Sequence, residues 1–167
     1  MGTRMSRLWR HFVTDRGTVH RTFPSSALDR IERAIADGEQ QHSGQVRFAV
    51  EAALPLQRVW HRLPPRERAL EVFGLLRIWD TEANDGVLLY VVLADRDVEI
   101  VADRGIHAKV GEAEWKRICN GIQTAFRAGQ FADGVEQGIA EISALLARHS
   151  PRTGPGPNEL PDRPVVL

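Results

Sequence analysis

The sequence predicts a single α/β domain in which a mixed β-sheet lies between helices on both faces. Residues 87–93 are apolar at every position, and a strand without a polar face has to be covered on both sides. Residues 98–103 follow after a short turn and predict an antiparallel neighbour nearer the sheet edge. Segments with helical spacing flank both strands, and a length of 167 residues suits one domain with a sizeable core.

We divide the chain into a basic N-terminal helix or extension at residues 1–22, an α/β domain at residues 23–149 and a tail at residues 150–167. The tail is rich in proline and glycine, so we expect it to be flexible. Its apolar end, residues 165–167, leaves open the alternative that it docks onto another part of the protein.

In the N-terminal segment, Leu8, Trp9 and Phe12 can share one side of a short helix, and five arginines lie within residues 1–22. Two interpretations remain open. The helix lies across the domain, or it makes a weak cationic contact with a membrane surface.

The next elements form a β-α-β unit. Residues 26–35 have helical spacing after a capping-box-like start at Ser26, and residues 45–52 alternate as a strand does. Pro65 suits the first turn of a helix that we expect to continue to Trp79 and to be heavily packed. With the strand at 87–93, this unit should cross over right-handed between parallel strands.

The second half predicts two more helices. Residues 106–111 are expected to be a short connector, residues 112–128 have the spacing of an amphipathic helix, and a last helix covers residues 131–149.

Composition and motifs exclude several classes of function. Acidic and basic residues balance at 22 each, so nothing indicates a nucleic-acid partner. No apolar run is long enough for a transmembrane segment or a secretory signal, and we therefore expect a cytoplasmic protein. There is no nucleophile elbow, P-loop or dinucleotide fingerprint, which leaves any hydrolysis to a metal or a carboxylate.

A candidate metal site follows from the geometry of the predicted hairpin. Residues equally far from the turn lie opposite one another, so Asn84 and Asp85 should come near Asp103 and His107. Oxygen-rich ligands favour a hard cation, so calcium or magnesium would be the cofactor. The alternative is that these are turn residues selected for backbone shape.

A second candidate cluster, Asp95 and Asp97, lies at the other end of the hairpin. It should lie toward the carboxyl end of the central strand, where open α/β sheets often bind ligands. The simpler alternative is a hairpin turn with a local charge pair.

A family resemblance extends over residues 69–146. It is carried by NDGVLL at residues 84–89, DRDVEI at residues 95–100 and the joint at residues 126–134. Together these resemble the TPM domain, named after a thylakoid lumen protein, a photosystem II-associated protein and a nematode receptor modulator. The resemblance implies a sheet with Rossmann-like layering and places the chain with short, cytoplasmic members of bacterial type.

The resemblance also implies an acid-phosphatase activity and divalent-metal binding at an acidic cluster, as in some relatives. The family's usual Asp-Asn-Gly is here Asn84-Asp85-Gly86, and its Gly-Tyr-Gly is here Asp103-Arg104-Gly105. Two hypotheses follow. The chain is a module that acts through contacts with an unknown protein partner, with or without a divalent ion, or it is a metal-dependent phosphomonoester hydrolase.

Overall fold

The computed structural model describes residues 2–167, with side chains described from residue 5 onward. The described residues form helices α1 (Gly2–Val13), α2 (Arg16–Thr22), α3 (Ser25–Glu39), α4 (Leu56–Trp60), α5 (Pro65–Leu75), α6 (Arg104–Val110), α7 (Glu112–Arg127) and α8 (Phe131–His149). The strands are β1 (Gln45–Glu51), β2 (Gly86–Val92), β3 (Asp97–Ala102) and β4 (Val165–Val166).

The four strands form one mixed sheet in the order β3-β2-β1-β4. Strand β2 pairs in parallel with β1 and antiparallel with β3, while β4 pairs in parallel with β1. The predicted fold class, the central position of β2 and the edge position of β3 are therefore confirmed.

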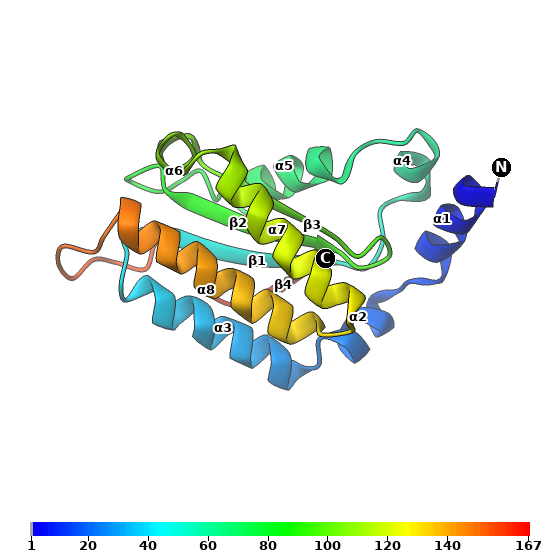
Figure 1. Cartoon of the computed structure of the whole chain (residues 1–167), viewed down its shortest axis with the longest axis horizontal. Helices are drawn as coiled ribbons and strands as arrows, with labels where there is room; N and C mark the ends of the chain where they lie inside the picture. The colour runs from blue at the N-terminus through cyan, green and yellow to red at the C-terminus, as the bar shows by residue number, and fades with distance from the viewer. Residues whose placement is uncertain (1) are drawn as a thin grey trace.

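Two hydrophobic clusters cover the two faces of the sheet (Figure 1). Val87, Leu89 and Val91 of β2 pack with α3, α7 and α8 on one face. Leu88, Tyr90 and Val92 pack with α4, α5 and the C-terminal segment on the other. All seven residues of β2 are buried, as an apolar strand with no polar face requires.

The helix predicted to reach Trp79 ends earlier, and the expectation of heavy packing is wrong for part of it. Helix α5 ends at Leu75, and Arg77 has a left-handed backbone with φ of 54°. Only one side of α5 faces the sheet: Ala69 and Val72 are buried, whereas Leu70 and Leu75 are exposed. Apolar residues around the whole helix axis suggested burial on all sides, but none of the elements that the structure describes packs over the outer side of α5.

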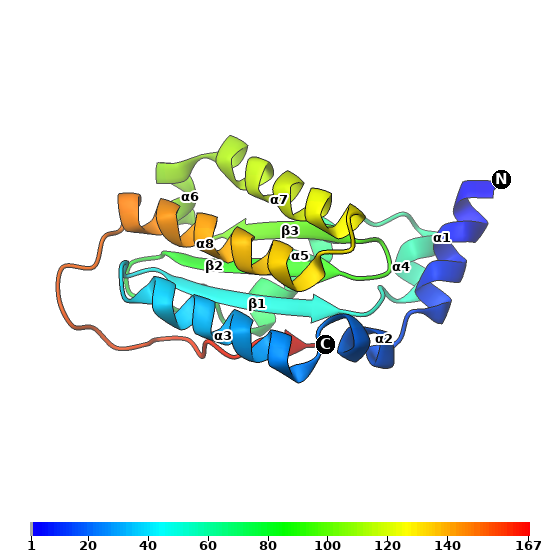
Figure 2. The same ribbon diagram turned by 60° about the horizontal axis from the view of Figure 1, so that its bottom comes forward.

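The tail at residues 150–167, predicted to be flexible, instead follows the sheet to its edge (Figure 2). Gln45 Oε1 accepts hydrogen bonds from the backbone N–H groups of Glu159 and Leu160, at 2.9 and 2.8 Å. Leu160 is buried, and β4 then pairs with Ala49 and Val50 of β1. The apolar end docks because β1 would otherwise leave this edge of the sheet unpaired.

Three short helices were not predicted from the sequence. Helices α2, α4 and α6 span seven, five and seven residues, too few to establish a helical period. The expected connector at residues 106–111 lies largely within α6. Among the described residues, no helix is long and apolar enough to cross a membrane.

Candidate functional site

The loops before β1 and β2 meet the end of β3 at one corner of the sheet. The backbone N–H of Asp103 donates to Gly86 O at 2.8 Å, and that of Ile106 donates to Asn84 O at 3.2 Å. Gly105 allows this approach, since a Cβ atom there would lie 2.6 Å from Asn84 O. The predicted proximity of the Asn84–Asp85 and Asp103 backbones is therefore observed.

Asp85 is the most deeply placed acid of the corner, with only 1% of its surface exposed. Its Oδ2 accepts a hydrogen bond from Ser43 Oγ at 3.0 Å, and its backbone N–H donates to Thr81 Oγ1 at 3.2 Å. Its Oδ1 is buried without a hydrogen-bond partner. The side chain thus joins the loop before β1 to the loop before β2.

Asp103 has a separate local role at the start of α6. Its Oδ1 accepts a hydrogen bond from the backbone N–H of Arg104 at 2.7 Å, while its Oδ2 is buried without a partner. His107 lines a different hollow, of about 420 Å³, together with Arg66, Glu99 and Trp115. Asn84 contributes its carbonyl and a left-handed backbone with φ of 53°.

The described residues contain no group of three or more His, Cys, Asp or Glu side chains able to hold a metal. What the corner does offer is two buried carboxylate oxygens without partners, Oδ1 of Asp85 and Oδ2 of Asp103. Magnesium is commonly held by one or two carboxylates together with water, whereas calcium needs more protein oxygens, so oxygens as few as these would fit magnesium better than calcium.

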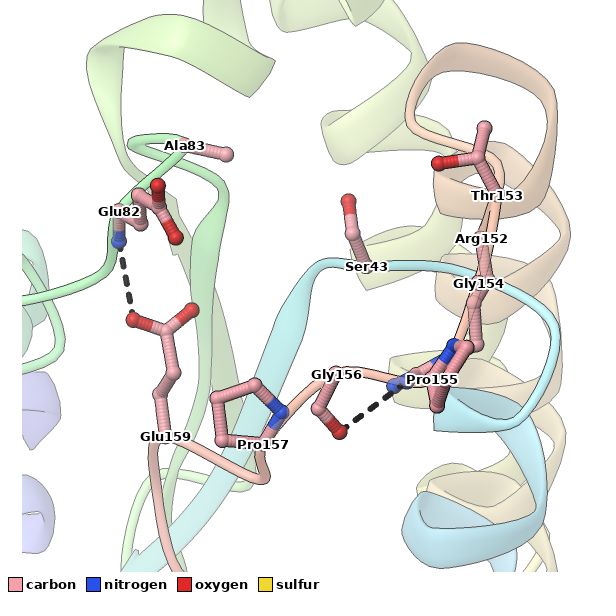
Figure 3. A pocket seen from close by; sticks show the side chains of 10 residues that line it. All are labelled: Ser43, Glu82, Ala83, Arg152, Thr153, Gly154, Pro155, Gly156, Pro157 and Glu159. Carbon is pink, nitrogen blue, oxygen red and sulfur yellow. Dashed lines mark hydrogen bonds between the residues drawn. The ribbon is translucent and has the colours of Figure 1, made fainter.

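A cavity of about 520 Å³ opens beside this corner, between the loops before β1 and β2 and the tail (Figure 3). Ser43 lines it, as do Glu82 and Glu159, whose carboxylates lie on the same side in Figure 3. The backbone N–H of Glu82 donates to Glu159 Oε2 at 2.9 Å. Arg152 lines the opposite side and donates from Nε to Glu39 O at 2.9 Å. The sequence did not reveal this cavity, because it depends on the tail being docked.

The second candidate cluster is divided between two structural contacts. Asp95 binds α1: Arg7 Nη2 lies 2.7 Å from Oδ2, and His11 Nε2 lies 3.0 Å from the same oxygen without the alignment of a hydrogen bond. Asp97 Oδ1 accepts from Gln123 Nε2 at 2.8 Å and from the backbone N–H of Val98 at 2.9 Å. The turn is thus partly an anchor for the N-terminal helix.

The electrostatics of the two acids differ accordingly. Burial opposes ionisation of Asp95, but contacts with His11 and Arg7 outweigh it and hold the pKa of Asp95 well below its usual range. Burial raises the pKa of Asp97, and the negative charge of Asp95 adds to that effect. The spacing of Arg7 and His11, one helical turn apart, was the sequence signal that could have indicated an acidic partner.

Comparisons with known proteins were consistent with this architecture. The model of the TPM domain matches residues 20–145. The NMR structure of the BA42 protein from the psychrophilic bacterium Bizionia argentinensis is similar over 87% of this chain and 95% of its own, with 29% sequence identity and a TM-score of 0.77.

The solution NMR structure of the N-terminal domain of a protein from P. gingivalis shares the fold. It has 17% identity and a TM-score of 0.60, and the match covers 79% of this chain and 83% of that one. None of the curated proteins compared matches the chain.

Proposed function

The chain belongs to the TPM domain family, and we propose that it acts as a non-catalytic interaction module in the cytoplasm. One observation carries this proposal: Asp85, the central acid of the corner, is buried and joins two loops through Ser43 and its own backbone. Asp103 likewise serves the start of α6. These side chains hold the domain together, which is a structural task.

A second candidate, a metal-dependent phosphatase, has its own support. Ser43 is exposed toward the cavity and donates to a buried carboxylate, and Asp85 and Asp103 each keep one unpartnered oxygen. A magnesium ion held there would supply Lewis acidity and lower the pKa of an attacking water. Against it, His107, expected as a further ligand, lines another hollow, and the described residues contain no group of three or more His, Cys, Asp or Glu side chains able to hold a metal.

Hydrolysis of p-nitrophenyl phosphate separates the two candidates. We would compare the wild type with Asp85→Asn and Asp103→Asn, each with EDTA, Ca²⁺, Mg²⁺ or Mn²⁺. The matched control is Asp80→Asn, because the Asp80 side chain is 51% exposed and forms an ion pair with Arg77, three residues away in the sequence. The proposal expects no turnover above the blank in any condition. Metal-dependent turnover that both corner variants lose and the control keeps would overturn it.

Thermal unfolding in the same samples tests for the ion itself. A cation that binds only the folded protein raises the melting temperature by mass action. A rise that disappears in Asp85→Asn, without turnover, would assign a structural ion to the module. No rise in any protein would exclude these three cations at this corner.

A further inference from the structure

Helix α1 is attached to the domain by its polar side. Arg7 and His11, one turn apart, both reach Asp95. His11 Nδ1 also accepts a hydrogen bond from the backbone N–H of Leu54 at 3.0 Å. With 3.6 residues per turn, the side of α1 opposite these two residues carries Met5, Trp9 and Phe12. An amphipathic helix normally buries its apolar side, and this one presents it to solvent.

The exposed apolar surface continues onto α4. Met5, Trp9 and Phe12 are 74%, 64% and 68% exposed, and the rings of Trp9 and Phe12 stack with centroids 5.9 Å apart. Together with Leu8 and Leu56 they line a hollow of about 380 Å³. We call these five residues the α1–α4 face. An exposed apolar patch of this kind is typical of a surface that binds another protein or a membrane.

The charge around the α1–α4 face is positive. Residues 1–22 contain five arginines and one acid, Asp15, in a chain with a formal net charge of zero. Asp15 is already bound to the backbone N–H of Thr18 and lies near Arg21, and Asp95 is covered by α1. Arg10 also reaches Asp95, with Nη2 3.4 Å from Oδ1, but its side chain remains 54% exposed on α1, and Arg16 of α2 is exposed as well. Figures 1 and 2 both place α1, α2 and α4 at one end of the molecule, opposite the tail loop of Figure 3.

We infer that the α1–α4 face docks onto an anionic phospholipid surface, with Trp9 and Phe12 at the boundary between headgroups and acyl chains. Interfacial helices combine aromatic and aliphatic residues on one side with arginines beside them, and anionic lipid satisfies both features. A second copy of the chain would instead bring two arginine-rich segments together. If the protein is an interaction module, as proposed above, the lipid surface is its partner. Docking itself does not depend on that proposal.

Co-sedimentation with vesicles tests the inference. The wild type should bind vesicles of phosphatidylglycerol and phosphatidylcholine, should bind pure phosphatidylcholine at least about tenfold more weakly, and should lose binding as salt is raised. The double variant Trp9→Ser with Phe12→Ser should lose binding to the anionic vesicles at least about tenfold. Its circular dichroism and melting temperature should stay unchanged, because both side chains are exposed.

The matched control is Leu75→Ser with Trp79→Ser, which removes similar exposed apolar surface, 70% and 51% exposed, elsewhere on the molecule. This control should bind as the wild type does. No binding by the wild type, equal binding to neutral vesicles, or unchanged binding by the Trp9 and Phe12 variant would each overturn the inference. The inference would also be overturned if the wild type formed a dimer and only the Trp9 and Phe12 variant failed to form it, because a second copy of the chain would then cover this face.

The vesicle result and the phosphatase result are independent, because they concern opposite ends of the molecule. Turnover at the corner would overturn the non-catalytic proposal and leave lipid docking standing. Absent vesicle binding would overturn lipid docking and leave that proposal standing.

Discussion

The hydroxyl of Tyr90 on β2 donates a hydrogen bond to the carboxylate of Glu51 on β1, on the face of the sheet that α5 covers. Arg68 of α5 holds the same carboxylate in a two-point contact, with Nε 3.0 Å from Oε2 and Nη2 3.1 Å from Oε1. Burial and the neighbouring carboxylate raise the pKa of Tyr90, so the hydroxyl stays protonated and donating. This contact secures a helix to the sheet.

We therefore expect Tyr90→Phe to lower the free energy of unfolding by about 1–2 kcal/mol, the cost of losing one donor to a charged acceptor. Glu51→Leu should cost about 3 kcal/mol, because it removes the acceptor of the buried Tyr90 hydroxyl and leaves Arg68 only its contact with Glu71, at 3.2 Å. Urea denaturation measures both. Equal losses for the two variants would contradict the shared role of Glu51.

Gly86, the first residue of β2, permits a close backbone contact. A Cβ atom there would lie 2.1 Å from Ile78 O, and the backbone cannot yield as a flexible side chain would. Gly86→Ala should destabilise the protein by about 2–3 kcal/mol. Gly121→Ala is the control: nothing lies within 4 Å of its Cβ position on α7, so it should stabilise the protein by about 0.5–1 kcal/mol. If the melting temperature fell for both Gly86→Ala and Gly121→Ala, the predicted difference between a crowded and an open glycine would be refuted.

Glu39, at the end of α3, should make stability depend on pH. Burial raises the pKa of Glu39 to about 7, from an ordinary value of 4.5, although its Oε1 accepts from the backbone N–H of Val46. A raised acid pKa means that the folded state holds its proton longer, so stability falls as the pH rises from 4.5 to about 7.

Glu39→Gln keeps an acceptor for Val46 and removes the charge. At pH above about 7 it should be more stable than the wild type by about 1–2 kcal/mol, and the difference should vanish below 4.5. Urea denaturation across this range provides the measurement. A constant difference at every pH would show that another group causes the dependence.

Asp95→Asn should release α1 without unfolding the domain. Because the folded state lowers the pKa of Asp95, the ionised carboxylate stabilises the docked α1 fully at pH values above the ordinary pKa of 3.8. This stabilisation is lost only as the pH falls below that value. In the variant, the Leu54 amide, which donates to His11, should exchange its hydrogen faster at neutral pH. Asp97→Asn is the control, because its hydrogen bonds are to Gln123 and Val98. Equal exchange in both variants would contradict the anchoring role.

Gln45→Ala should loosen the docked tail. Its side-chain oxygen accepts from two tail amides, Glu159 and Leu160, in a place where Gln45 is 1% exposed. We expect both amides to exchange faster, while the amides of β2 keep their protection. Unchanged exchange at both tail amides would show that β4 and Leu160 are enough to hold the tail.

The parts of the fold that were predictable are those with a strong local pattern. The uniformly apolar sequence of β2 predicted its central position in the sheet. The amphipathic periods of α7 and α8 predicted which side of each helix is buried. Docking of residues 165–167 was only an open alternative, because two strand residues carry no period and their partner lies far away in the sequence.

The candidate site was predictable in its backbone and not in its side chains. Hairpin register brought Asn84 and Asp103 together, as expected from residues equidistant from a turn. Whether a carboxylate turns inward, as Asp85 does toward Ser43, or caps a helix, as Asp103 does, depends on loops elsewhere in the chain. His107 lies in another hollow because it is part of α6, a helix that was not predicted from the sequence.

The β1–β4 pair also bears on how the protein reaches its fold. The outer edge of β1 stays open during synthesis until residues 165–166 have emerged, whereas β2 can pair with β1 and β3 much earlier. Pairings between distant segments form slowly, because the loop between them has to close first. An open strand edge is meanwhile a template for pairing with another chain. Nascent chains that still lack β4 should therefore be the species most prone to aggregate.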